Sequence, residues 1–529
     1  MSVQVFNYYQ DSYMPAGPLA DANLYAPEAM LLTAPFIVNW LNTATSLIRN
    51  GLVDCDFGFS IHVEGQKPCI KIQDWTNTKK WVPQTESGAS PLIYTPSSNS
   101  ATTVEIVSEL DLLLTAGRLN ARSLRIIESA YDKEKAAYGD LPALMLAQQL
   151  LITTPEFHTS AKNDLVAARS SARGTRTRDP LQYKAIVFFY LGGGCDSFSM
   201  LLPYDGCEGE DRYEQYVAAR GAWGGTSALQ KSKILPIDAP EKSLGSKQAC
   251  SRYAVNPNMP YIKKLYDEED ALFFANTGVM TEAGVDRHNF VRERGRLPKA
   301  LFGHNTMTRY TQNLDADNFD NNLGVIGRMM DNLQGQGAST ASYSVDAGRN
   351  ADSLTPRNST PYDVISHDGV TKLGEYTNRS IGAPVQELTS QVSASPLAET
   401  WASQLRSSIV RTDALEEVLA NAPPLKQAFK AESMESKIGK SAKQVAKLIS
   451  INKDKHERNA FHIKLGGFDA HNSFEETGYR LAYVDKALES FEQEMKLQGV
   501  WDQVVVVQAS DFGRTVQSNG RGTDHAWGG

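Results

Sequence analysis

The sequence predicts an α/β protein: a mainly parallel β-sheet with helices on both faces, preceded by a mainly helical N-terminal domain. Short, continuous apolar runs, typical of strands that are buried on both faces, occur from residue 184 onward. Segments with helical spacing separate these runs, and strands that alternate with helices are joined by crossovers in a parallel sheet. The length of 529 residues exceeds what one hydrophobic core usually organises, so at least two domains are expected.

Residues 1–165 are predicted to form the helical domain. Apolar residues recur at helical spacing in three segments, 109–114, 123–137 and 141–151, and Thr154-Pro155 closes the last of them. Residues 166–180 are then predicted to be a linker. This stretch is basic, but it is also rich in Ser and Gly, which favours a solvated segment.

Residues 181–529 are predicted to form the α/β domain, from four apolar runs and the segments between them. The expected strands are 185–191 (AIVFFYL), 271–275, 461–465 and 504–507, and a helix over 474–497 precedes the last one. Residues 335–396 contain few apolar side chains and are rich in Ser, Thr, Asn and Gly, which predicts a long surface excursion. Helical spacing returns over residues 398–450, which are expected to form a cap or insertion.

Composition and charge exclude several classes of protein. Hydrophobic residues make up 41% and charged residues 22%, and the net charge of −8 is spread along the chain. No concentrated basic stripe is present, so a nucleic-acid partner is not expected. No apolar stretch is long enough to span a membrane. The first residues lack the layout of a signal peptide.

The five cysteines form no C-x-x-C pair, which excludes a zinc ribbon. Cys55 with Cys69, and Cys195 with Cys207, could close short loops in an oxidising compartment. The odd number of cysteines then leaves one thiol over.

Three of the predicted strands are followed by small residues and then an aspartate: Asp196, Asp469 and Asp511. The carboxyl ends of parallel strands lie at one edge of the sheet, where ligands bind. Converging carboxylates repel one another unless a cation is bound between them. The sequence therefore predicts a metal site at this edge.

Two histidines, His471 and His525, could complete such a site. A mixed Asp/His set suits zinc, manganese or iron better than calcium. Each aspartate has a simpler interpretation as the cap of a following helix, and Asp511 could pair with Arg514. Three other histidines are expected to be structural or exposed: His288, His367 and His462.

Four motifs carry a resemblance to a known family. They are 191–203 (LGGGCDSFSMLLP), 297–306 (LPKALFGHNT), 466–471 (GGFDAH), and 510–515 together with 523–529. In this order they resemble the family called domain of unknown function 1501, over about residues 184–529, with a weaker match across 340–455. Members of this family look like distant relatives of the alkaline phosphatase and sulfatase superfamily, which implies an alkaline-phosphatase-like fold.

A second resemblance covers the N-terminal part. Residues 5–9 (VFNYY), 15–27 (PAGPLADANLYAP) and 147–157 (AQQLLITTPEF) resemble the C-terminal section of the family called domain of unknown function 1800. Members of both families are commonly exported, which implies a periplasmic, envelope or extracellular location. Both ends of the chain look truncated relative to these families, the C-terminal end at Trp527-Gly528-Gly529.

The first resemblance implies a metal-dependent hydrolase that acts on a phosphate or sulfate ester, either a small ester or a polysaccharide. Asp469, His471 and His525 would hold one ion. Asp196 and Asp511 would hold a second, since two ions about 4 Å apart can clamp the attacking and leaving oxygens. Arg514 would neutralise ester oxygens with its planar guanidinium, completing the expected site.

The nucleophile implied by the superfamily is a hydroxyl at the start of a helix, for which Thr306 and Ser197 are the candidates. Two residues depart from the family pattern: Gly303 replaces a Ser, and Ser197 replaces a Gly. No C-x-P-x-R run is present, so a formylglycine sulfatase is not expected. The alternative function is a non-catalytic exported or cell-surface scaffold that keeps the fold, and Gly303 favours it.

Overall fold

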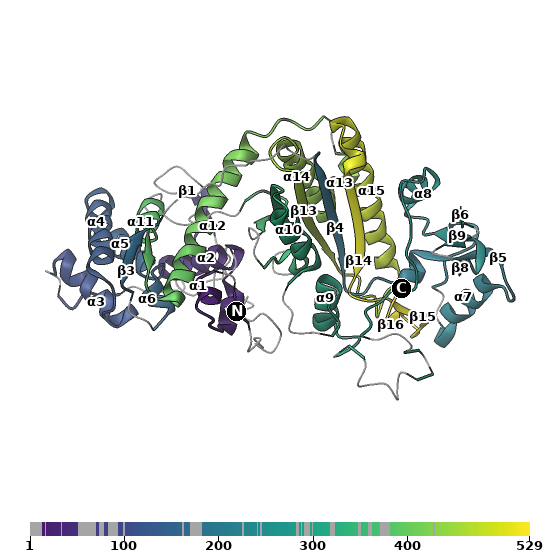
Figure 1. Ribbon diagram of the computed structural model, residues 1–529, viewed down its shortest axis with the longest axis horizontal. Helices are drawn as coiled ribbons and strands as arrows, with labels where there is room; N and C mark the ends of the chain where they lie inside the picture. The colour runs from purple at the N-terminus through teal and green to yellow at the C-terminus, as the bar shows by residue number, and fades with distance from the viewer. Residues whose placement is uncertain are drawn as a thin grey trace. The chain divides into compact units, whose positions relative to one another are not determined.

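The computed structural model describes most of the chain. The described residues are 13–15, 17–32, 34–50, 70–73, 79–82, 94–98, 101–160, 163–169, 182–224, 227–240, 242–243, 246–281, 285–286, 288–289, 297–298, 300–317, 323–346, 351–357, 362–370, 381–426 and 429–529. They divide into two compact units (Figure 1). The N-terminal unit comprises Met1–Thr175 with Val370–Glu417, and the C-terminal unit comprises Arg176–Gly369 with Val418–Gly529.

Helices dominate the N-terminal unit, as predicted. Its elements are α1 (Pro18–Asp21), η1 (Pro27–Leu31), α2 (Ala34–Asn50), β1 (Ile70–Gln73), β2 (Lys79–Val82), α3 (Thr103–Thr115), α4 (Ala121–Tyr138), α5 (Asp140–Leu151), α6 (Pro155–His158), β3 (Leu165–Ala168), α11 (Gly382–Leu388), β12 (Gln391–Ser393) and most of α12 (Pro396–Ala420). The three predicted helices correspond to α3, α4 and α5. Thr102 and Asn120 cap the first two of these through their side chains, which fixes where the helices begin.

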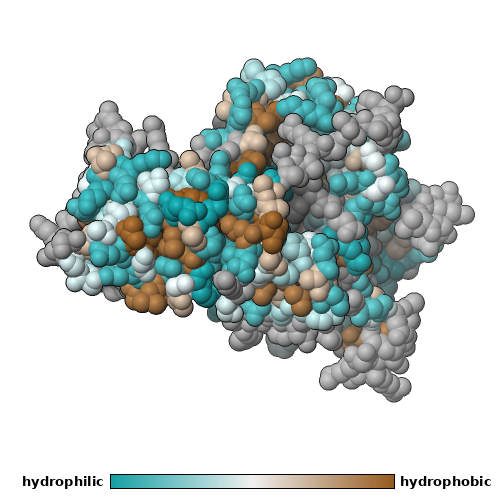
Figure 2. All heavy atoms as spheres, turned by 60° about the vertical axis from the view of Figure 1, so that its left-hand side comes forward, coloured by the Kyte–Doolittle hydropathy of each residue, from teal (hydrophilic) through white to brown (hydrophobic). Residues whose placement is uncertain are grey.

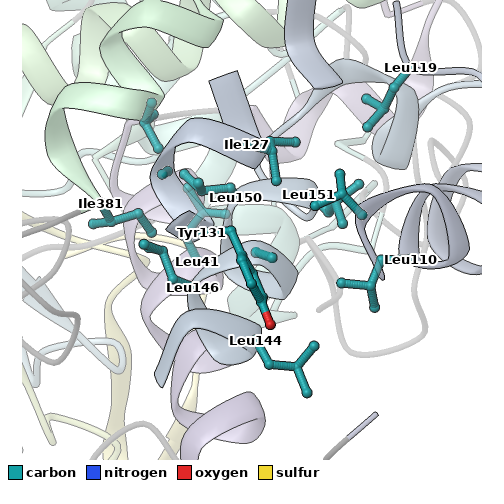
Figure 3. Packing of buried hydrophobic residues seen from close by; sticks show 14 of the residues in the cluster. Leu41, Leu110, Leu119, Ile127, Tyr131, Leu144, Leu146, Leu150, Leu151 and Ile381 are labelled. Carbon is teal, nitrogen blue, oxygen red and sulfur yellow. The ribbon is translucent and has the colours of Figure 1, made fainter. Parts of the chain in front are cut away.

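The main hydrophobic core among the described residues of this unit is built largely from leucine and isoleucine side chains of α2, α3, α4 and α5 (Figure 3). Ile381, Trp401 and Leu405 join the same core from much later in the sequence. The indole of Trp401 also donates to the carbonyl of Thr153 at 2.8 Å. Burying these apolar side chains stabilises the return of the chain to this unit.

The structure does not contain the single insertion that was predicted over residues 398–450, because these residues are divided between the two units. Its first part lies in α12 and packs on the N-terminal unit, whereas its last part, α14 (Lys437–Asn452), lies in the C-terminal unit. The predicted linker over 166–180 overlaps β3, which pairs with β12. Residues 170–180 of that linker, and residues 5–9 of the second resemblance, lie outside the described residues.

A five-stranded sheet forms the centre of the C-terminal unit, in the order β11-β10-β13-β4-β14. Its strands are β4 (Lys184–Gly192), β10 (Thr340–Val345), β11 (Asp363–Ile365), β13 (Arg458–Gly466) and β14 (Val504–Ser510). Every neighbouring pair is parallel. The predicted strands at 185–191, 461–465 and 504–507 are confirmed, and so is the predicted helix, which is α15 (Glu475–Gln498).

Two predictions of secondary structure in this part of the sequence are wrong. Residues 271–275 form no strand, and Leu272 and Phe274 in this run are exposed. The predicted excursion over 335–396 contains β10 and β11, of which β10 (TASYSV) buries two serines as well as Tyr343. Polar residues inside a buried strand gave this segment a loop-like composition. Residues 371–380 of the excursion lie outside the described residues.

Helices cover both faces of the sheet, which confirms the predicted α/β class. On one face, Phe188 and Tyr190 pack with residues of α10 (Val325–Gly335) and the short helix η6 (Asp352–Leu354). On the other face, Tyr343 stacks on Phe461 beneath α14, and α15 packs on α14.

The remaining elements of this unit surround the sheet. They are η2 (Ser197–Ser199), β5 (Leu201–Cys207), α7 (Arg212–Arg220), η3 (Ala222–Gly224), β6 (Leu235–Asp238), β7 (Lys242–Ser243), β8 (Ser246–Lys247), β9 (Cys250–Val255), α8 (Pro260–Asp267), α9 (His304–Asn313), α13 (Ala431–Met434), η7 (Trp501–Gln503), β15 (Arg514–Ser518) and β16 (Thr523–His525).

In the part of the chain that the structure describes, a disulfide joins Cys207 to Cys250, which face each other on the antiparallel strands β5 and β9. The predicted pairing of Cys195 with Cys207 is therefore wrong, and Cys195 is a free, buried thiol. Cys55 and Cys69 lie outside the described residues.

Most of the coloured surface in Figure 2 is hydrophilic, with hydrophobic residues in separate patches. Across the described residues, none of the helices is both long and apolar enough to cross a membrane.

Candidate functional site

Three neighbouring strands deliver the three predicted aspartates to one edge of the sheet. Asp196, Asp469 and Asp511 follow the carboxyl ends of β4, β13 and β14. The loops after β4 and β13 touch: the Phe468 amide donates to the carbonyl of Gly192 at 3.1 Å. Gly193 makes this approach feasible, because a Cβ there would lie 2.6 Å from the backbone nitrogen of Asp469.

Three histidines surround Asp469 and form with it what we call the His–Asp cluster: His304, Asp469, His471 and His525. His304 is the first residue of α9 and His525 ends β16 (Figure 1 shows α9 and the β15–β16 hairpin at one end of the sheet). Ligand atoms of His304, Asp469 and His525 all lie within 4.8 Å of one another. His471 joins them through its Nε2 atom, 2.8 Å from Nε2 of His525 and 3.1 Å from Oδ1 of Asp469.

The Nε2 atoms of all three histidines point towards the Asp469 carboxylate. Nε2 of His525 lies 3.1 Å from Oδ1, and Nε2 of His304 lies 3.4 Å from Oδ2. Nε2 of His304 is also buried and has no hydrogen-bond partner among the described residues. Side chains from three separate segments, His304, Asp469 and His525, therefore bring their ligand atoms together, and His471 adjoins them at His525 and Asp469.

The opposite nitrogen of each ring is held by an acceptor. Nδ1 of His304 lies 2.8 Å from Asp511. Nδ1 of His525 lies 2.8 Å from the carbonyl of Phe302, and Nδ1 of His471 lies 3.2 Å from Asp524. A carbonyl can only accept, so we assign the hydrogen of His525 to Nδ1, and the two carboxylates favour the same tautomer for the other rings.

This tautomer leaves three lone pairs facing a carboxylate. Two Nε2 atoms 2.8 Å apart repel each other unless a proton or a metal ion lies between them. Metal-binding histidines commonly donate their second N–H to a carboxylate or a backbone carbonyl, which is the arrangement around this cluster. Three imidazoles with one carboxylate could hold a divalent transition metal.

The charges around the cluster favour ionised carboxylates. Partial burial on its own raises the pKa of Asp469, but the polar contact with His525 and the positive charge of Arg514 hold it below its usual value. Burial likewise acts to raise the pKa of Asp511, and hydrogen bonds from His304 and Tyr190 lower it overall. The hydrogen bond to Asp511 raises the pKa of His304.

Arg514 lies beneath the cluster and is fully buried. Its Nε donates to the carbonyl of Gly194 at 2.7 Å, and its other nitrogens bind Asp469 and the carbonyls of Gly193 and Thr523. The guanidinium thus ties the loops after β4 and β13 to the β15–β16 hairpin. The structure places Arg514 as a positioning residue for Asp469, without the exposure that the predicted contact with ester oxygens requires.

Asp196 is separated from the cluster by its own partners. It is 1% exposed and accepts hydrogen bonds from Arg220 at 2.7 Å and Ser199 at 2.6 Å. Asp511 is equally occupied, by Tyr190 at 2.6 Å and by His304. The predicted second ion between Asp196 and Asp511 does not match this geometry, because hydrogen bonds already use their carboxylate oxygens.

The two predicted nucleophiles lie near the same edge. Thr306 is in the first turn of α9, two residues after His304. Ser197 begins η2, and its Oγ lies 2.4 Å from where a Cβ of Gly529 would be. Within the described residues, neither hydroxyl forms a hydrogen bond with a side chain of the cluster.

The sequence interpretation missed three residues of this site. His304 was missed as a possible ligand, and Asp524 and Tyr190 were missed as the hydrogen-bond partners of His471 and Asp511. His304 stands in the motif 297–306 and Asp524 in the motif 523–529, so the motifs contained the signal. The spacing of 165 residues between His304 and Asp469 hides their contact, which depends on the docking of α9 through Met307, Tyr310 and Phe512.

Comparison with known proteins gives one positive result. A family model described as "Protein of unknown function (DUF1501)" matches residues 183–529. No curated protein and no solved structure matches the chain.

Proposed function

Through residues 183–529 the chain belongs to the DUF1501 family, and from this premise we propose that it is a metal-dependent hydrolase of phosphate or sulfate esters. The observation that carries the proposal is the convergence of three imidazole nitrogens on Asp469, with the opposite nitrogen of every ring held by an acceptor. A structural hydrogen-bond network needs no such concentration of lone pairs. Two unpaired donor nitrogens in contact are costly unless a cation binds them.

His304, Asp469, His471 and His525 would hold one divalent ion, zinc or manganese. Such an ion, when bound, supplies Lewis acidity that activates water and polarises an ester oxygen. Asp511 and Asp524 would orient two of the imidazoles, and Arg514 would fix Asp469. Because Arg514 is buried, the anionic oxygens of the substrate would face the ion and not this guanidinium.

The substrate would be a small ester or an ester group on a polysaccharide. Thr306 and Ser197 remain the two candidates for a protein nucleophile, and water is the third. The proposal includes a distant relationship to the alkaline phosphatase and sulfatase superfamily, and an exported location. We also propose that residues 1–165 are related to the family called domain of unknown function 1800.

A non-catalytic, exported scaffold is the second candidate function. The N-cap of α9 is Gly303, which has no side chain to cap the helix, and the motif normally has a serine there. A Cβ at this position would lie 3.1 Å from the carbonyl of Ala300, so a serine would be tightly packed. The site therefore lacks one hydroxyl next to His304.

One experiment separates these two functions. The purified chain is loaded with zinc or manganese, its metal content is measured, and hydrolysis of nitrophenyl phosphate and nitrophenyl sulfate is followed. We expect one ion per chain, hydrolysis of at least one ester, loss of both in Asp469→Asn, and loss of hydrolysis with weakened metal binding in His304→Ala. His288→Ala is the control, because His288 is exposed and lies outside the cluster. A loaded protein that hydrolyses neither ester favours the scaffold, and a protein that binds no metal contradicts the proposal.

A further inference from the structure

Lys464 is a cation at the same edge of the sheet as the His–Asp cluster. It lies in β13, five residues before Asp469, and is paired with Tyr190 of β4. A Cβ built on Gly192 would lie 2.8 Å from Cε and 3.6 Å from Nζ of this lysine. The side chain therefore runs across the end of β4, and its ammonium group lies beside the last residues of the two strands.

Contacts of the sheet connect this ammonium group with the cluster. Its Nζ lies 6.0 Å from the centre of the Tyr190 ring, and the hydroxyl of Tyr190 donates to Asp511. Asp511 in turn holds Nδ1 of His304 and accepts from the amide of Gly193. A short chain of contacts, through Tyr190 and Asp511, thus joins Lys464 to the candidate ligand His304.

The charge of Lys464 has no close acceptor. Among the described residues, its Nζ forms no ion pair and no hydrogen bond, and its polar contact is the ring of Tyr190. Burial lowers the pKa of Lys464, and the negative charges of Asp511 and Asp352 offset this effect only in part. A partly buried ammonium group without an acceptor is unfavourable, and a bound anion would supply the acceptor.

Other cations near this edge are already occupied. Three arginines each pair with a carboxylate: Arg220, Arg480 and Arg514. Two of them, Arg220 and Arg514, are also fully buried. Lys464 differs from them, because it combines partial exposure with a charge that has no carboxylate partner among the described residues.

The ends of the two strands leave room for a ligand beside Lys464. Gly192 and Gly466 face each other across β4 and β13, so neither strand end carries a side chain there. Gly466 is exposed, and it points to the same face as Lys464, two residues earlier. A Cβ built on Gly466 would meet no described atom within 4 Å. This open space lies between Lys464 and the loop that carries Asp469.

We propose that Lys464 binds the anionic oxygens of the ester group at the His–Asp cluster, and so selects substrates with a charged tetrahedral group, phosphate or sulfate. This inference deepens the proposed function and rests on it. An ammonium group is a compact charge with three donors, which suits an oxygen of such a group. The contact with ester oxygens that was expected of Arg514 would thus belong to Lys464, because Arg514 is buried.

The test titrates inorganic phosphate and inorganic sulfate into the full chain, metal-free and zinc-loaded, by isothermal titration calorimetry. Lys464→Met removes the charge and keeps an unbranched side chain, whereas Lys464→Arg keeps the charge. Lys184→Met is the matched control, because Lys184 is exposed and begins β4 at the opposite edge of the sheet. The zinc affinity of every variant is measured with a zinc-sensitive dye, since a merely structural role of Lys464 would change it.

We expect the zinc-loaded wild type to bind at least one of the two anions, and Lys464→Met to bind it about 10–100-fold more weakly with unchanged zinc affinity. Lys464→Arg should bind the anion more tightly than Lys464→Met, and Lys184→Met should match the wild type. Four results overturn the proposal: the wild type binds neither anion in either form; Lys464→Met binds as tightly as the wild type; Lys184→Met loses as much affinity as Lys464→Met; or zinc affinity falls as far as anion affinity.

Failure of the proposed function gives a different result. Anion binding that depends on Lys464, without hydrolysis of either nitrophenyl ester, would remove the hydrolase and keep the anion site. Hydrolysis whose kcat and KM are unchanged in Lys464→Met would keep the hydrolase and overturn the role of Lys464.

Discussion

Asp196 and Asp469 follow adjacent parallel strands through similar glycine-rich turns, yet their surroundings differ completely. Asp196 is 1% exposed and forms an ion pair with Arg220, whose side chain is fully buried. The side chain of Asp469 is 46% exposed and faces three histidines. The strand that precedes each aspartate thus determines where its carboxylate lies. The neighbouring side chains determine whether the carboxylate is buried in an ion pair or open to a ligand.

The two aspartates should therefore have different roles, one in stability and the other in binding. A buried carboxylate with a buried guanidinium is a closed pair, and its removal affects stability. A carboxylate that is open to solvent and surrounded by imidazoles can exchange its partners, which a binding site requires. Mutations at the two positions should therefore give different kinds of effect.

The largest expected effect is on stability, at Asp196. Asp196→Ala leaves the charge of Arg220 buried without its partner, which should lower the free energy of unfolding by about 3–5 kcal/mol. Asp469→Asn keeps an amide oxygen that can still accept from the buried Arg514, whose other bonds go to carbonyls, so its loss should be smaller, about 1–2 kcal/mol in the metal-free protein. Urea unfolding of both variants measures this, and Asp196→Ala with Arg220→Met should recover most of the loss. Equal losses at the two positions would remove the distinction.

A second prediction concerns a histidine that is buried on the same strand that leads to Asp469. Burial lowers the pKa of His462, in the middle of β13, to about 3. The unfolded chain binds a proton below about pH 6.5 and the folded chain does not, so stability is lost as the pH falls from 6.5 towards 3. By pH 4.5 this residue should have lowered the free energy of unfolding by about 2–3 kcal/mol.

His462→Asn removes this titration. Urea unfolding at pH 7 and pH 4.5 should show a smaller loss of stability in the variant than in the wild type. The variant should also be less stable at pH 7, because the hydrogen bond between Ser353 and His462 is disturbed. A variant with the full acid sensitivity of the wild type would show that His462 is not the responsible group.

The smallest effect is expected at Asp524, which orients the candidate ligand His471 and is not itself a candidate ligand. Asp524 fixes Nδ1 of His471 and is itself exposed. Asp524→Asn should weaken zinc binding by about 10–100-fold while leaving stability nearly unchanged. Competition with a zinc-sensitive dye measures the affinity, and Asp502→Asn, outside the cluster, is the matched control. An unchanged zinc affinity would show that His471 needs no such support.

The fold was predictable where side-chain pattern and burial agree. The apolar runs of β4, β13 and β14 and the helical spacing of α4 and α5 gave correct elements. β10 was missed because it buries Ser342 and Ser344, whose polarity imitates a loop. The return of residues 381–409 to the N-terminal unit was missed because long-range packing, and not local pattern, decides it.

The candidate site was predictable in part. The strand–glycine–aspartate pattern placed Asp469 and His471 together, and the last motif added His525. The pattern could not reveal that Arg220, 24 residues after Asp196, neutralises the carboxylate of Asp196. Nor could it place His304, because only the docking of α9 brings this residue to β13.

The most direct test of the central claim is X-ray absorption at the zinc edge of the zinc-loaded protein, compared with His304→Ala. The imidazole signal counts the histidines that bind the ion. We predict three imidazoles in the wild type and two in His304→Ala, with no change in Asp196→Asn. Two imidazoles in the wild type, or a spectrum that His304→Ala leaves unchanged, would contradict the His–Asp cluster as the metal site.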